Sequence, residues 1–319
     1  MIFYKKFKSL LRPVRTRFRI LFFGLYSSKW YPISIKELHS KVDIKARNSF
    51  EIEDLANLLK RINLKNKDTV SKICLAGTTL ELEKQKIFWK QEIVKDLDSE
   101  FDNALYRFHW MLEETVKNED KNEVLKFIQI MQSWFYSYRK SAKSIAFQPY
   151  NTSERICNLT IFLLTVYRNH LLSEEELRIY QEFIAEDLAV LKDSLEYPAS
   201  GVVNNHILNN ARALMIGGFF IGNSDLIALA KGILRLHLPK MINKNGYLEE
   251  SSSHYQLLLT RSLIEISLIS EILLDQDFFD WVNDYTQRMF LASSRLEPKE
   301  DNYKSHFPNI GDVSPDIPL

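Results

Sequence analysis

The chain has 319 residues, of which 45% are hydrophobic and 26% are charged; this is the composition of an ordinary globular protein and excludes disordered and fibrous classes. The formal net charge of +1 does not favour binding to nucleic acid. Two widely separated cysteines, Cys74 and Cys157, do not favour a disulfide framework or a thiolate metal site, so both are expected to be free, buried thiols.

The first 40 residues are predicted to form a basic N-terminal arm. Lysine and arginine are frequent before the first acidic residue, Glu37. The apolar run Ile20–Leu25 is too short to span a bilayer, which needs about 20 residues, and no small-residue cleavage site follows it. The favoured interpretation is an arm packed on its own domain, and the alternative is contact with an anionic membrane surface. No export signal is evident, which favours a cytoplasmic or loosely membrane-associated protein.

Residues 41–295 are predicted to form one helical domain. From His39 to Gln148 there is no proline, and Gly77 is the only glycine, so this stretch favours helices over sheets. Apolar side chains recur at helical spacing in three stripes. The stripes are Leu105, Phe108, Leu112 and Val116; Val124, Phe127, Ile128, Met131, Trp134 and Phe135; and Leu177, Tyr180, Ile184, Leu188, Leu191 and Leu195.

Local signals predict where several helices begin and end. Ser173 and Glu176 have the spacing of a capping box, in which each side chain satisfies a free backbone N–H group. Gly222 followed by Asn223 predicts that one helix ends and the next is capped.

The arrangement of the helices follows from their connections. Asn245-Gly246 predicts a tight turn, and residues 257–274 are apolar on most faces, which predicts a helix buried between neighbours. Successive amphipathic helices with short connections form a bundle, a solenoid or a ring of helical hairpins, and no fixed-period repeat supports a solenoid. Residues 296–319 contain four prolines and no helical pattern, so they are predicted to be a linker toward a further domain.

Several common kinds of catalytic site have no sequence signal in this chain. There is no glycine-rich phosphate loop, zinc-protease motif, paired-cysteine motif or serine-nucleophile elbow. The seven histidines are scattered, and none lies in a carboxylate-rich cluster with metal-ligand spacing. Neither a metal nor a cofactor is therefore expected.

A polar stripe on an otherwise apolar helix is the strongest candidate site. At 3.6 residues per turn, Asn205, Asn209 and Arg212 share one face, with His206 and Asn210 beside it. Because the rest of this helix is apolar, the stripe must meet polar partners or line a wet cavity. Spacing alone supports a buried hydrogen-bond network and a catalytic site equally.

Two further segments combine polar and aromatic side chains at similar density. They contain Tyr150, Arg155 and Asn158, and Glu250, His254 and Tyr255. Such groups suit elimination next to a carboxylate, because an amide can bind a uronate carboxylate and acidify the adjacent C–H group. A tyrosine or histidine can then remove the proton and protonate the departing oxygen, and a nearby arginine can lower the pKa of a tyrosine that acts as base.

The order of four segments resembles the heparinase II/III-like polysaccharide lyases, and more narrowly the branch found in bacterial capsule and surface-polysaccharide gene clusters. The segments begin Leu105-Tyr-Arg-Phe-His-Trp, Gln148-Pro-Tyr-Asn-Thr-Ser-Glu-Arg, Asn205-His-Ile-Leu-Asn-Asn-Ala-Arg and Glu249-Glu-Ser-Ser-Ser-His-Tyr. The resemblance extends from about residue 100 to residue 319. It is carried by the Asn-His segment together with the downstream Glu-Ser and Tyr, since each motif alone is weak.

The resemblance implies an all-α fold, an incomplete (α/α) toroid of helical hairpins, without the C-terminal β-sandwich that follows it in the family. By position, Asn205 would neutralise a uronate carboxylate, His206 would assist or act as base for one epimer, and Tyr255 would be base and acid. One departure is Gln256, where many members have histidine. The residues that would bind or support the substrate are Tyr150, Arg155, Asn158, Asn209, Arg212, Glu250 and His254.

Three functions remain open from the sequence. The chain is a lyase that cleaves an acidic polysaccharide by β-elimination, an accessory domain that binds such a polysaccharide without turnover, or a structural helical interaction module. The presence of Asn205, His206 and Tyr255 together favours the first two. The expected absence of the second domain favours the accessory domain over the lyase.

Overall fold

The structure is a computed structural model, and it describes residues 72–75, 78–81, 99–112, 144–197, 204–296 and 310–311, with parts of 124–135. The predicted basic arm, residues 1–40, lies outside the described residues, as does most of the predicted linker 296–319. Within that linker, the amide and carbonyl of Ile310 both bond to Ser253, each at 3.0 Å. This contact holds Ile310 at Ser253, the first residue of the helix Ser253–Ile272.

Nearly all of the described elements are helices. An antiparallel hairpin of β1 (Lys72–Leu75) and β2 (Thr78–Glu81) comes first, and it flanks the single glycine of the proline-free stretch. The helices are α5 (Ser99–Arg107), the 3₁₀ helix η4 (Ser144–Phe147), α8 (Pro149–Arg168), α9 (Glu174–Lys192), α10 (Asn205–Phe220), α11 (Ser224–Met241), α12 (Ser253–Ile272) and α13 (Gln276–Ser294). The predicted helical fold is therefore confirmed, and the small hairpin is the one departure from an all-α chain among the described residues.

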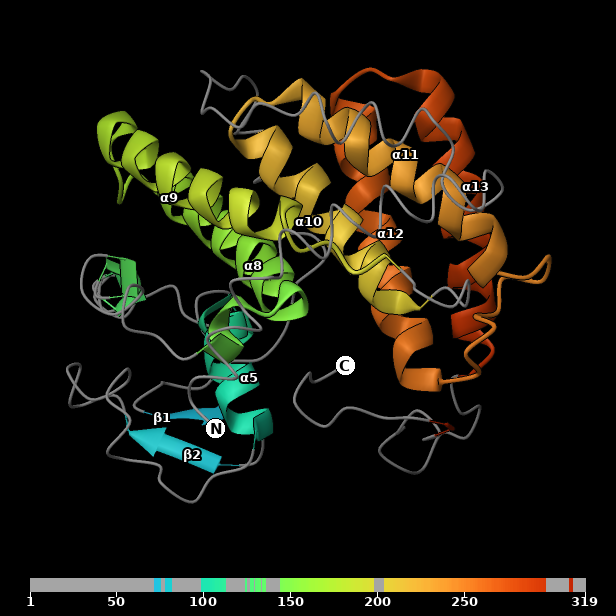
Figure 1. The fold of residues 1–319 in the computed structure, drawn as a ribbon, viewed down its shortest axis with the longest axis horizontal. Coiled ribbons are helices and arrows are strands. Elements are labelled where there is room, and N and C mark those ends of the chain that lie inside the picture. The colour runs from blue at the N-terminus through green and yellow to red at the C-terminus, as the bar shows by residue number, and fades with distance from the viewer. Residues whose placement is uncertain are drawn as a thin grey trace.

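The six long helices form three hairpins that lie side by side (Figure 1). Helix α8 pairs with α9, α10 with α11, and α12 with α13. The first members also contact one another, α8 with α10 and α10 with α12, so they form an inner row that is flanked by the second members. Because each hairpin reverses the chain, α8, α10 and α12 run in the same direction, and their N-terminal ends lie together.

The predicted helix boundaries match the structure. Ser173 and Glu176 form the capping box at the beginning of α9, with the Ser173 side chain accepting from the Glu176 amide at 3.2 Å. The side chain of Asn223 accepts from the backbone amides at the beginning of α11, both at 3.1 Å. Gly222 has a φ of +66°, the left-handed conformation that follows a helix end and favours glycine.

The apolar stripes are buried as predicted, except that Val116 lies outside the described residues. The first stripe is not one continuous helix, because Phe108 has a φ of +60° between α5 and the helical residues 109–112. Its fully buried ring packs against Trp110 and Trp134, with centroids 5.9 Å and 5.8 Å away. Tertiary packing of this aromatic cluster accompanies a backbone conformation that is rare for a bulky residue.

The turn between α11 and α12 forms at the predicted Asn-Gly pair. Gly246 has a φ of +84°, and a Cβ atom there would lie 2.1 Å from the carbonyl oxygen of Arg288. Gln256 accepts a hydrogen bond from the Leu248 amide at 2.8 Å and donates one to the Gly246 carbonyl at 2.9 Å. The side chain that stands where the resembled family commonly has histidine therefore stabilises this turn.

The predicted buried helix 257–274 corresponds to α12, which ends two residues earlier than the apolar pattern does. Leu274 has a φ of +52° and is 87% exposed, so it belongs to the turn between α12 and α13. None of the described helices is long and apolar enough to cross a membrane.

Candidate functional site

A recess of about 410 Å³, counting its opening to solvent, lies between the inner helices α8, α10 and α12. Five of the lining residues were predicted as site residues from the sequence, and five were not. The lining residues are Tyr150, Glu154, Asn205, Asn209, Arg212, Tyr255, Leu258, Leu259, Arg261 and Ser262.

The opening of the recess lies at the N-terminal ends of the inner helices. Tyr150 is the second residue of α8, Asn205 the first of α10 and Tyr255 the third of α12. Free backbone N–H groups give helix N-termini a positive partial charge, so three such ends together favour an anion. The side chain of Asn205 lines the recess, and its backbone amide donates to Glu250 at 3.2 Å.

His206 lies beside the recess and pairs with an acidic residue that the sequence analysis missed. Its Nδ1 is 3.1 Å from a carboxylate oxygen of Glu196, and its ring centroid is 4.9 Å from that of Tyr150. Burial acts to lower the pKa of His206, but the hydrogen bond and charge of Glu196, with the charge of Glu250, outweigh it, and the pKa is raised. His206 therefore carries a positive charge up to a higher pH than a free histidine does.

Asn210 holds Glu196 in this position. The Asn210 side chain accepts from the Glu196 amide at 2.8 Å and donates to its carboxylate at 3.3 Å. It also donates to the hydroxyl of Ser153 at 3.1 Å, so it joins α8 and α10. The part of the polar stripe that turns away from the recess is thus a buried hydrogen-bond network that orients His206.

The ring of Tyr150 contacts two basic groups. The guanidinium of Arg107 is 4.9 Å from its centroid, and the imidazole of His206 is at the same distance. Burial raises the pKa of Tyr150 well above its usual range, with a further contribution from Glu154, against the opposing charges of Arg107 and Arg212. The phenol therefore keeps its proton and acts as a hydrogen-bond donor.

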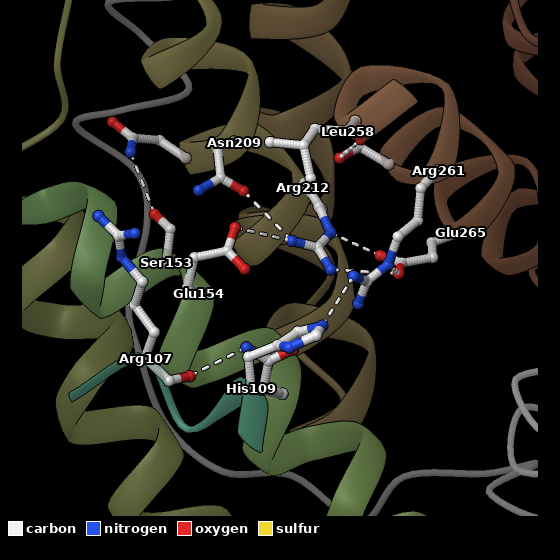
Figure 2. Close-up of polar contacts among 12 residues, drawn as sticks. Arg107, His109, Ser153, Glu154, Asn209, Arg212, Leu258, Arg261 and Glu265 are labelled. Carbon is white, nitrogen blue, oxygen red and sulfur yellow. Dashed lines mark hydrogen bonds and ion pairs between the residues drawn. The ribbon is translucent and has the colours of Figure 1, made fainter. Parts of the chain in front are cut away.

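Arg212 forms the inner wall of the recess and is already engaged (Figure 2). Its Nε and Nη2 donate to the two carboxylate oxygens of Glu265 at 2.5 Å and 3.1 Å. Its Nη1 donates to Glu154 at 3.0 Å and to the Asn209 side chain at 3.3 Å. With 3% of its side chain exposed, Arg212 holds the three inner helices together and does not offer a free edge to a ligand.

Glu154 stays ionised in this buried cluster. Burial alone would raise its pKa, but the charges of Arg212, Arg261 and Arg107 lower it below its usual value. A buried carboxylate in such a network is stabilised only while its cationic partners remain. The cluster therefore fixes the register of α8, α10 and α12 at the depth of the recess.

Arg155 does not lie in the recess, which corrects its assignment as a substrate contact. It is 0% exposed and donates to Asp187 at 2.8 Å and 3.3 Å and to the Ala146 carbonyl at 2.6 Å. Five positions along a helix amount to about 500°, so Arg155 points about 140° away from Tyr150. Its guanidinium carbon lies 5.4 Å from the ring centroid of Trp134 and 5.6 Å from that of Phe147, and its bonds to Asp187 tie α8 to α9.

Asn158, His254 and Glu250 also lie outside the recess. Asn158 is fully buried and donates to the Arg107 carbonyl at 2.9 Å, so it is a structural link between α8 and α5. His254 is buried behind Tyr255, with its ring 5.9 Å away and edge-on. Glu250 is exposed and accepts from the Asn205 amide. The first two are corrected to structural positions, and Glu250 supports the beginning of α10.

The acidic and basic residues Glu154, Glu265 and Arg261 were not among the residues predicted for the site. Glu154 follows Tyr150 by four residues, and Glu265 follows Arg261 by four, which places each pair on one helix face. The same spacing rule that identified Asn205 and Asn209 was therefore available for these residues. Glu196 has no such signal, because it lies between α9 and α10, ten residues before His206, and is not on the same helix.

Cys157 is a free, buried thiol, as expected, and burial raises its pKa far above the usual range. The side chain of Cys74 lies outside the described residues. Within the parts of the chain that the structure describes, no three or more His, Cys, Asp or Glu side chains are grouped to hold a metal ion.

No protein-family model matches the chain, and no curated protein matches it either. Solved structures with the same fold exist. One is the heparan sulfate lyase HepC from Pedobacter heparinus, with a TM-score of 0.53 and 12% identity over 83% of this chain and 43% of that one. A mutant of the same lyase has a TM-score of 0.51 and 15% identity, over 82% and 42% of the two chains.

A heparinase III, described as the BT4657 gene product, has a TM-score of 0.51 and 12% identity over 80% of this chain and 42% of that one. The chain thus spans less than half the length of the structures that it resembles. At these identities the likeness shows the fold. The predicted incomplete (α/α) toroid, similar to part of these heparinase structures, is confirmed.

Proposed function

We propose that the chain is a polysaccharide lyase-like domain that binds a uronate-containing polysaccharide in the recess and cleaves it by β-elimination. The observation that carries this proposal is the convergence of the Asn205 amide with the phenols of Tyr150 and Tyr255 at the positive ends of three inner helices. The likeness of the fold to heparan sulfate lyases supports it.

Each residue at the opening has a role in such a reaction. The Asn205 amide donates to the uronate carboxylate and stabilises the negative charge that develops when the adjacent C–H group loses its proton. Tyr255 takes that proton, the bond to the glycosidic oxygen breaks, and a carbon–carbon double bond forms in the uronate. Tyr255 then returns the proton to the departing oxygen, so protons and electrons balance.

Tyr150 and His206 support the same step. Tyr150 stays protonated, because burial raises its pKa, and donates a hydrogen bond to the sugar. His206 is held by Glu196 and adds positive charge beside the carboxylate. Its raised pKa suits it to binding an anion and not to removing a proton at neutral pH.

Binding without turnover is the second candidate. It is favoured because two of the candidate bases at the recess are unsuited to that role. His206 is paired with Glu196, and Tyr150 keeps its proton because its pKa is raised, so Tyr255 is the one remaining candidate among the described residues. In this case the recess holds the polysaccharide, but no proton is removed from it.

The test is to mix the purified protein with heparan sulfate, unsulfated heparosan, alginate and hyaluronan and to follow the absorbance of unsaturated uronate. We expect a rise with at least one polymer, and its loss in Tyr255→Phe and Asn205→Ala. The matched control is Tyr167→Phe in the last turn of α8, about 26 Å along the helix from Tyr150, which should leave the rate unchanged.

The three interpretations predict different results. Binding without any absorbance change supports the accessory domain. If no polymer binds and Asn205→Ala only lowers the melting temperature, the polar stripe is a structural network and the proposed function is wrong.

A further inference from the structure

Arg261 is the charged residue of the recess whose hydrogen bonds are incomplete. Its Nε donates to Glu265 at 3.1 Å, and its Nη1 lies 3.1 Å from Nε2 of His109. Its Nη2 is buried and has no hydrogen-bond partner among the described residues. The side chain is 23% exposed and lines the recess.

The Arg261 guanidinium is held from two sides (Figure 2). Glu265 is itself fixed by Arg212, and His109 comes from a segment 152 residues earlier in the chain. Little side-chain freedom therefore remains for a ligand to remove on binding.

A buried donor without an acceptor is costly, and a ligand oxygen that accepts its hydrogen bond removes that cost. A guanidinium is suited to oxyanions, because its planar N–H groups match the oxygens of a carboxylate or a sulfate. Arg212 has the same chemistry, but each of its three guanidinium nitrogens already donates to Glu265, Glu154 or Asn209. Arg261 is thus the guanidinium of the recess that has capacity for an anion.

We propose that Arg261 forms a second anion site in the recess, which binds an oxyanion on the saccharide unit next to the one held by Asn205. The inference rests on the proposed polysaccharide ligand. Arg261 follows Tyr255 by six residues, or about 9 Å along α12, so this anion is not the reacting carboxylate. The oxyanion is the carboxylate of a neighbouring uronate or a sulfate, and Arg261 selects polymers that carry it.

The experiment measures the affinity of the full chain for heparan sulfate and for unsulfated heparosan of equal length. Arg261→Gln removes the charge, Arg261→Lys keeps it without the planar N–H pair, and Arg178→Gln on the exposed face of α9 is the charge-matched control. We expect Arg261→Gln to weaken binding about tenfold or more, the effect of losing one charge-assisted hydrogen bond, and Arg261→Lys to weaken it less. Arg178→Gln should change it less than twofold.

The ligand comparison identifies the source of the oxyanion. An equal loss for both polymers identifies a uronate carboxylate, and a loss for heparan sulfate alone identifies a sulfate. Unchanged affinity of Arg261→Gln for both polymers, with wild-type binding intact, overturns the second anion site and leaves the proposed function standing. If the wild type binds neither of these polymers, the same variants are compared on whichever of alginate and hyaluronan it binds, and if it binds none of the four, both proposals are wrong. If Arg261→Gln does not fold, Arg261→Lys decides by the same criterion.

Discussion

His237 is a buried histidine of the outer helix α11. We predict that it lowers the stability of the folded protein at acidic pH. It is 1% exposed, and neither ring nitrogen has a hydrogen-bond partner among the described residues. Burial, together with the nearby charge of Lys240, lowers the pKa of His237 from 6.5 to about 3. The folded protein therefore keeps this ring neutral at pH values where the unfolded chain protonates it.

The magnitude follows from proton linkage. Because the folded pKa is depressed, the unfolded state binds more protons between the two pKa values, and stability falls as the pH drops below 6.5. The loss amounts to about 1.4 kcal/mol per pH unit, or about 2 kcal/mol at about pH 5 relative to about pH 7.5. For a domain with a total stability of about 5–15 kcal/mol, this is a large fraction.

The assay is urea denaturation, followed by circular dichroism, of the wild type and His237→Leu at about pH 7.5 and about pH 5. Leucine fills a similar volume without polar atoms, so the variant should lose about 2 kcal/mol less stability than the wild type does between the two pH values. His170→Asn, an exposed position with a φ of +57° that asparagine tolerates, is the control and should follow the wild type. Equal pH dependence of the wild type and His237→Leu would refute the reasoning.

Three further predictions concern the turn, the buried cluster and the site. Gly246→Ala should lower the free energy of unfolding by more than about 1 kcal/mol in thermal denaturation, because its Cβ atom would lie 2.1 Å from the Arg288 carbonyl oxygen at a φ of +84°; an unchanged melting temperature contradicts this. Arg212→Met should cost about 3–5 kcal/mol in urea denaturation, because it leaves buried carboxylates without their cation, and adding Glu265→Gln should recover part of the loss. Polysaccharide binding should weaken as the pH rises through the raised pKa of His206, since the positive charge is present only below it, and His206→Gln should abolish that pH dependence in calorimetric titrations.

Helix positions and the composition of the polar stripe follow from the sequence. Backbone hydrogen bonds give each helix a period of 3.6 residues, so Asn205, Asn209 and Arg212 share a face independently of the tertiary packing around the helix. The caps at Ser173 and Asn223 were equally predictable, because a cap depends on residues within one turn.

The partners of those side chains were decided by the tertiary structure. Which face of α8 turns toward α10 depends on long-range packing, and this places Glu154 in the recess and Arg155 against Asp187, although the two are neighbours in the sequence. The same reason separates Arg212, whose three guanidinium nitrogens all donate hydrogen bonds, from Arg261, whose Nη2 has no acceptor among the described residues. Hydrogen-bond satisfaction depends on groups far apart in the chain, and no local pattern encodes it.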